Sequence, residues 1–89
     1  MKFGVVIGQV VATRKDEKLV GCKLLVVRPV DERRDAAGEA LVAVDTVGAG
    51  VGETVLYVQG SVSSRAMRDA AAPTDAAIVG IVDQIDCYD

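Results

Sequence analysis

The chain has 89 residues, a mass of 9.3 kDa, two cysteines and no histidine. A single domain spanning residues 1–89 buries only about 60 to 65% of its unfolded surface, so domains of this size commonly rely on disulfides, a metal or self-association. Without paired Cys and His ligands a structural zinc site is excluded, and a net charge of −3 argues against a nucleic-acid partner, because phosphate recognition requires Lys and Arg.

Five apolar segments rich in β-branched residues follow one another along the chain, each closed by turn-forming residues. The predicted strands are residues 3–13, 23–30, 40–45, 54–59 and 77–86. Between the last two, residues 61–72 carry helix formers and precede Pro73, which predicts one short helix. Gly8 and Gly80 lie inside strong strands, where glycine typically marks a bulge or bend. The sequence therefore predicts an all-β fold, a small five-stranded closed barrel with one short helix.

The predicted strands are apolar on both faces. A half-buried antiparallel strand alternates apolar and polar residues, whereas residues 5–7, 24–27 and 78–79 are apolar without interruption. Only one short helix is available to cover the second face, and a contiguous apolar patch of more than a few hundred Å² is unusual on a monomer. We therefore expect further copies of the chain to cover it, and we expect the protein to be stable only as an oligomer.

The location expected from the sequence agrees with this interpretation. Residues 1–4 lack the features of a secretory signal, and no apolar run approaches the roughly 18 residues of a membrane span. We expect a cytoplasmic protein with no membrane partner, in which Cys22 and Cys87 stay reduced. Self-association is then the remaining source of stability.

The glycine-rich segment from Gly48 to Gly52 invites comparison with phosphate-binding loops. It reads GxGxG, has no GK[ST] and precedes a predicted strand instead of a helix, so it fails the nucleotide-binding pattern. We interpret it as a tight structural loop that uses the freedom of glycine at positive φ. Replacing Gly50 by Val is expected to disrupt it.

No residue pattern indicates catalysis. Four dispersed aspartates are more typical of local hydrogen-bond acceptors than of a carboxylate site: Asp45, Asp75, Asp83 and Asp86. Histidine, the commonest general base, is absent. We expect no enzymatic activity, no catalytic residues, no metal and no cofactor. The alternative function is a free-standing barrel of OB type that binds nucleic acid or a small ligand, although three aromatic residues and acidic charge suit it poorly.

Several segments, taken in order, resemble the bacterial microcompartment vertex family of EutN/CcmL type. They are GQVVAT at 8–13, KLLVV at 23–27, VAVDTVGAGVGE at 42–53, Gly60-Ser61 with Arg65, and IVGIVD at 78–83. The resemblance covers almost the whole chain, and the order of these segments makes it specific.

This resemblance implies a pentamer of OB-like barrels that caps the five-fold vertices of a polyhedral shell, as in carboxysome-like organelles. It implies as partners further copies of the chain and the hexameric and trimeric shell proteins. It also places six residues at the contact between subunits: Gly60, Ser61, Ser64, Arg65, Gly48 and Gly50. Because residues 60–65 are one longer than the corresponding family segment, Arg65 is the first candidate for the interface arginine and Arg68 the alternative.

Overall fold

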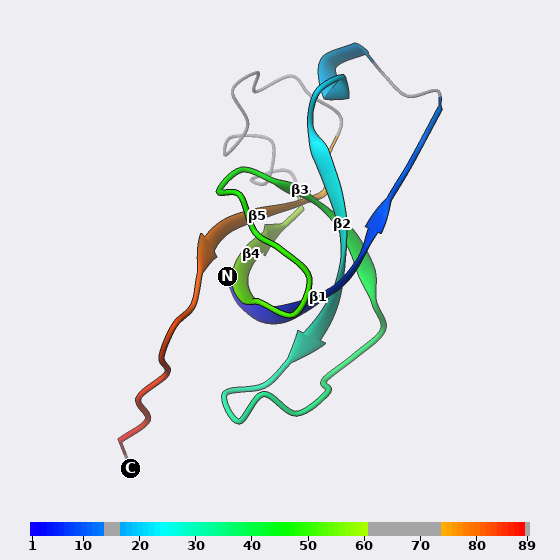
Figure 1. Ribbon diagram of the computed structural model, residues 1–89. Helices are drawn as coiled ribbons and strands as arrows, with labels where there is room; N and C mark the ends of the chain where they lie inside the picture. The colour runs from blue at the N-terminus through cyan, green and yellow to red at the C-terminus, as the bar shows by residue number, and fades with distance from the viewer. Residues whose placement is uncertain (14–16, 61–73, 89) are drawn as a thin grey trace.

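The computed structural model describes residues 1–13, 17–60 and 74–88 (Figure 1). Five strands and one short 3-10 turn follow in chain order: β1 Lys2–Val10, η1 Glu17–Leu19, β2 Lys23–Val30, β3 Leu41–Asp45, β4 Thr54–Gln59 and β5 Ala76–Ile81. The all-β prediction is confirmed, and the predicted bounds of β2 and β4 are correct. The predicted short helix over residues 61–72 lies outside the described residues.

The strands form a closed barrel in the order β1-β2-β3-β5-β4 (Figure 1). All neighbours pair antiparallel except β3 and β5, which pair in parallel through Val44–Ala77 and Asp45–Ile78. Thr46, just past β3, extends this short contact, since its hydroxyl donates to the Ile78 carbonyl at 2.6 Å. Among the described strands, closure leaves only short stretches of edge unpaired, such as the part of β3 outside its two-residue contact with β5. We therefore expect further contacts to use mainly side chains and loops.

Both predicted glycine irregularities are confirmed. In β1, Val6 pairs with Val27 and Gly8 with Val26, so Ile7 is an extra, unpaired residue. The ladder between β4 and β5 shifts in the same way, which leaves Val79 unpaired beside Gly80. Such bulges bend a strand and increase its twist, as closing a small barrel requires.

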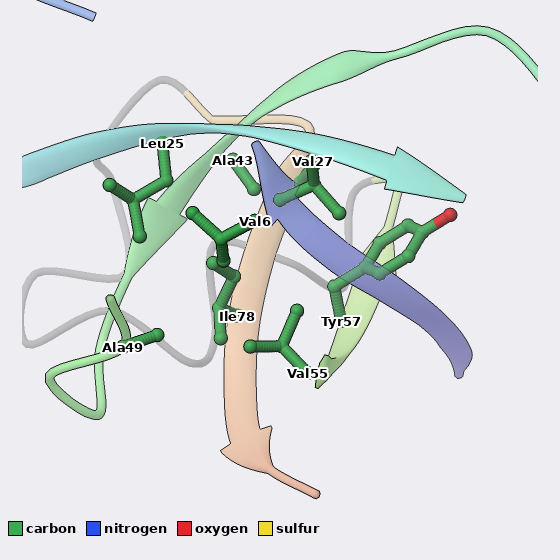
Figure 2. Packing of buried hydrophobic residues seen from close by; sticks show 9 residues of the cluster. Val6, Leu25, Val27, Ala43, Ala49, Val55, Tyr57 and Ile78 are labelled. Carbon is green, nitrogen blue, oxygen red and sulfur yellow. The ribbon is translucent and has the colours of Figure 1, made fainter. Parts of the chain in front are cut away.

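An aliphatic cluster with one tyrosine fills the barrel (Figure 2). Its members are Val6, Leu25, Val27, Ala43, Ala49, Val55, Tyr57, Ala76 and Ile78. Burying one Val, Leu or Ile side chain contributes about 1.5 to 3 kcal/mol. Ala49 comes from the loop between β3 and β4 and is fully buried, so this loop forms part of the core.

Two strands end earlier than predicted. β1 stops at Val10 instead of residue 13, because its ladder with β2 ends at the Val10–Leu24 pair. β5 stops at Ile81 instead of residue 86, because its partner β4 begins at Thr54 and accepts a last backbone bond from Val82. The chain beyond leaves the barrel (Figure 1). Within the described part of the chain, no helix is long and apolar enough to cross a membrane.

Candidate subunit interface

The loop between β3 and β4, residues 46–53, contains two of the predicted interface glycines and is held by side chains on both sides. At its start, Asp45 Oδ1 accepts the backbone N–H groups of Val47 and Gly48, each at 3.1 Å. This is the local acceptor role predicted for an aspartate at the end of a strand. The turn out of β3 is therefore fixed by the carboxylate.

Lys23 connects this carboxylate to the middle of the loop. Lys23 at the start of β2 lies directly opposite Asp45 at the end of β3. Its Nζ is 3.4 Å from Asp45 Oδ2 and donates a hydrogen bond of 2.5 Å to the Ala49 carbonyl. The Asp45 side chain is only 3% exposed and that of Lys23 40%, so the ammonium is the countercharge of a nearly buried carboxylate.

The far side of the loop is tied to β1. Glu53 Oε1 accepts the N–H of Gly50 at 2.7 Å, and the backbone N–H of Glu53 donates to the Gly50 carbonyl at 3.1 Å. Gly52 donates to the Val6 carbonyl at 2.8 Å, and Val6 donates to the Glu53 carbonyl at 3.0 Å. The loop is therefore ordered, while Val51 at its tip is 67% exposed.

The glycines of this loop differ in their backbone conformation. Gly48 has φ of 82° and Gly52 of 92°, both in the left-handed region that favours glycine. Gly50 is not among the described residues with positive φ, and a Cβ built there would meet Glu53 Oε1 at 3.4 Å. The expectation that Gly50 needs positive φ is wrong; Gly48 and Gly52 need it.

The second predicted interface segment begins at Gly60, directly after β4. Gly60 has φ of 79°, and its N–H donates to the Asp75 carbonyl at 2.8 Å. Ser61, Ser64 and Arg65 lie outside the described residues. Gly60 and the 46–53 loop flank opposite ends of β4, about 20 Å apart along an extended strand, so Gly60 does not lie beside Gly48 and Gly50 within a single chain.

The outer surface of the barrel carries the apolar side chains predicted from the strand pattern. In register, Gly8 lies beside Val26 and Val26 beside Val42, which forms a row across β1, β2 and β3. Val42 is 47% exposed in the single chain, and Ile7, next to Gly8, is also exposed. We call this set, Ile7, Val26 and Val42, the outer row. It offers uncharged contact area to another protein surface.

Polar chemistry is sparse in the described part of the chain. Cys22 and Cys87 are free thiols, and no group of three Cys, Asp or Glu side chains is placed to hold a metal ion there. Burial raises the pKa of the Tyr57 hydroxyl above its ordinary value. Tyr57 lines a shallow groove of about 470 Å³ with Lys2 and Gln59.

Sequence reasoning did not identify Lys23 and Glu53 as residues that shape this surface. Lys23 is 26 positions from the Ala49 carbonyl that it contacts, and only the pairing of β2 with β3 brings them together. For Glu53 a local signal existed, since it follows the glycine run and lies three residues after its partner Gly50.

Comparison with known proteins identifies relatives over nearly the full length. The family model described as ethanolamine utilisation protein EutN/carboxysome matches residues 1–83. The bacterial microcompartment shell vertex protein GrpN of Rhodospirillum rubrum (strain F11) is 46% identical over 86 residues, which cover 97% of each chain. The shell vertex protein EutN of Salmonella typhimurium (strain LT2) is 42% identical over 85 residues, or 96% of this chain and 86% of the relative.

A solved structure gives the same result in three dimensions. The GrpN pentameric microcompartment shell protein from Rhodospirillum rubrum superposes with a TM-score of 0.87 at 45% identity, with 100% of both chains covered.

Proposed function

Because the chain belongs to the EutN/CcmL family, we propose that it is a structural subunit of a bacterial microcompartment shell, and that five copies form a ring that caps a five-fold vertex. The chain acts as one unit over residues 1–89 and carries out no catalysis. Its role is geometric, since flat tiles of hexameric and trimeric shell proteins cannot close a polyhedron without a five-fold element at each corner.

The observation that carries this proposal is the outer row on a barrel that is closed through the strands of the described residues. A closed barrel has little edge with which to extend its sheet into a neighbour, so association must bury mainly side chains and loops. Apolar area removed from water stabilises the contact by about 25 cal/mol per Å². A single copy leaves Val42 and Val51 largely in water.

The separation of the two predicted interface segments fits a ring. A cyclic assembly larger than a dimer joins two different patches of each subunit, head to tail. The loop with Gly48 and Gly50 belongs to one patch, and the segment with Gly60, Ser61, Ser64 and Arg65 belongs to the other. In this arrangement the arginine donates hydrogen bonds to carbonyls or a carboxylate of the next copy.

The test of the assembly is the mass in solution. Light scattering of the purified protein should give about five times 9.3 kDa, and a clean monomer at all concentrations would contradict the proposal. Co-expression with candidate hexameric shell proteins should give closed shells with this chain and tubes or open sheets without it.

A substitution tests the second patch. Arg65→Ala is expected to weaken association more than it lowers the stability of the barrel, and Arg68→Ala is the matched comparison. Native mass spectrometry measures dissociation of the pentamer. If Arg65→Ala leaves dissociation unchanged and Arg68→Ala increases it, Arg68 is the interface arginine instead of Arg65.

A further inference from the structure

We infer that Lys23 is a positioning residue of the subunit interface, whose ammonium fixes the shape in which the 46–53 loop meets a neighbouring copy. The inference rests on the proposed function, in which this loop belongs to one patch of the ring. Lys23 acts through the Ala49 carbonyl and the Asp45 carboxylate.

The loop needs such a restraint because of its composition. Three of its eight residues are glycines, Gly48, Gly50 and Gly52, and glycine loses more conformational freedom on ordering than any other residue. If the loop were ordered only on contact with the next subunit, that entropy would be subtracted from the affinity. A loop already ordered in the free subunit avoids this loss.

The contacts of Lys23 lie where they determine the course of the loop. The Ala49–Gly50 peptide is held at both of its polar ends, because Lys23 donates to the Ala49 carbonyl and Glu53 accepts from the Gly50 N–H. It lies after the turn that Asp45 holds at the start of the loop. Ala49 is also a buried core residue, so its side chain and its carbonyl are both held. Between these fixed points, Val47 and Val51 are exposed at defined positions.

A general role in barrel stability does not account for these contacts as well. The β2–β3 ladder continues from Lys23–Asp45 through four further residue pairs to Val27–Leu41, and the core cluster does not include Lys23. The hydrogen bond of Lys23 goes to the loop, and its ion pair goes to the residue that forms the first turn of the loop. Loss of the ammonium also leaves the nearly buried Asp45 carboxylate without its countercharge. Because this carboxylate holds the first turn of the loop, we expect the loop to be affected before the core.

The experiment compares Lys23→Met with Lys23→Arg and with Lys2→Met. Methionine keeps the length and most of the apolar stem but has no donor, arginine restores the charge and donors, and Lys2 is an exposed lysine at the start of β1.

Sedimentation velocity over a range of concentrations gives the dissociation of the assembly, and circular dichroism gives the fold. Lys23→Met should retain the barrel spectrum and require at least about tenfold higher protein concentration to assemble, since it loses a charge-assisted bond. Lys23→Arg should restore most of this loss, and Lys2→Met should resemble the wild type.

Hydrogen exchange supplies a readout that does not depend on assembly. At a concentration where all variants are dissociated and circular dichroism still shows the barrel, the amides of Gly48 and Gly50 should exchange faster in Lys23→Met, whereas those of Val27 and Val55 in the core should not. Unchanged exchange at the two glycines, or equal loss of assembly in Lys2→Met, would overturn the inference. A wild-type protein that never assembles would overturn the proposed function instead, while the exchange of Gly48 and Gly50 would still report whether Lys23 orders the loop.

Discussion

Gly4 is the position in β1 where a side chain has no room. It faces the interior, and a Cβ built there would overlap Val27 Cγ1 and lie 3.1 Å from Tyr57 Cε1. Gly8, on the same strand, has only Val26 atoms at 3.9 Å. The two glycines can therefore be compared directly, because Gly4 lacks room for a side chain, whereas Gly8 lies at the bulge and has room for one.

Gly4→Ala is therefore expected to destabilise the barrel by about 1 to 3 kcal/mol, because overpacking forces neighbouring side chains and backbone to shift. Gly8→Ala should change stability by less than about 1 kcal/mol, since the added methyl meets no close atom and its φ is not in the left-handed region. Urea unfolding of both variants, monitored by circular dichroism, measures the difference. Equal destabilisation would contradict the packing of Gly4 against Val27.

Tyr57 gives the barrel a dependence on alkaline pH. Its ring is buried in the core cluster while its hydroxyl points away from that cluster (Figure 2). Burial disfavours the phenolate, so the pKa of Tyr57 in the folded chain lies above the ordinary value of about 10. Between the ordinary and the raised pKa the unfolded chain releases a proton that the folded chain retains, so stability falls as the pH rises.

We expect the free energy of unfolding to decrease above about pH 10 in the wild type and to decrease less in Tyr57→Phe. Below that pH the two proteins should show the same pH dependence. Chemical denaturation at about pH 8, 10 and 11 makes the comparison, because these conditions lie on both sides of the ordinary tyrosine pKa of about 10. The control is Tyr88→Phe, whose side chain is exposed; if it removes the slope as well as Tyr57→Phe does, the assignment is wrong.

At the scale of the element, the 46–53 loop contains glycines that need a positive φ and one, Gly50, that does not. Gly48→Ala places a Cβ at φ of 82° and should destabilise the folded chain by about 1 to 2 kcal/mol. Gly50→Ala meets only the end of the Glu53 side chain at 3.4 Å, and should have an effect below about 1 kcal/mol. Thermal unfolding of the two variants tests this order of stability. A lower melting temperature for Gly50→Ala than for Gly48→Ala would contradict it.

The strands show how far the sequence alone leads. β2 and β4 were predicted with correct bounds because β-branched residues and turn residues coincide with the ends of their ladders. Gly8 and Gly80 marked bulges correctly, because glycine inside a strand commonly marks either a bulge or a close approach, and Gly4 is the case of close approach. The ends of β1 and β5 were predicted too late, because β-branched residues such as Val11, Val82 and Ile85 occur past the last paired residues of these strands. The end of a strand depends on where its partner stops pairing, so the residues of one strand alone do not determine it.

The interface illustrates the same limit. The presence of an ordered loop at Gly48 to Gly52 was predictable, since glycine runs between strands form turns. The contacts of its members were not, because the Gly50 N–H bonds the Glu53 side chain and the Ala49 carbonyl bonds Lys23, which lies on another strand. The family resemblance proposes the interface segments, and the geometry shows which side chains hold the 46–53 loop.

At the scale of the whole molecule, the question is what covers the outer row. Val42 lies beside Val26 on the outside of the barrel and is 47% exposed in the single chain. A Glu at position 42 would be solvated in a monomer, and strand propensity would lower its stability by at most about 1 kcal/mol. In a pentamer that buries this row, the same carboxylate would be desolvated without a partner.

Val42→Glu is therefore expected to shift the protein from pentamer to monomer and, because the chain is expected to depend on its assembly for stability, to lower the free energy of unfolding. Val42→Ile keeps the apolar contact and the pentamer. Light scattering measures the mass and circular dichroism the fold of each variant at the same concentration. An intact pentamer of Val42→Glu, with the dissociation of the wild type, would show that water covers this row in the assembly. The ring would then be held by the 46–53 loop and the segment after Gly60 alone, and the apolar outer face would serve a contact with a different shell protein.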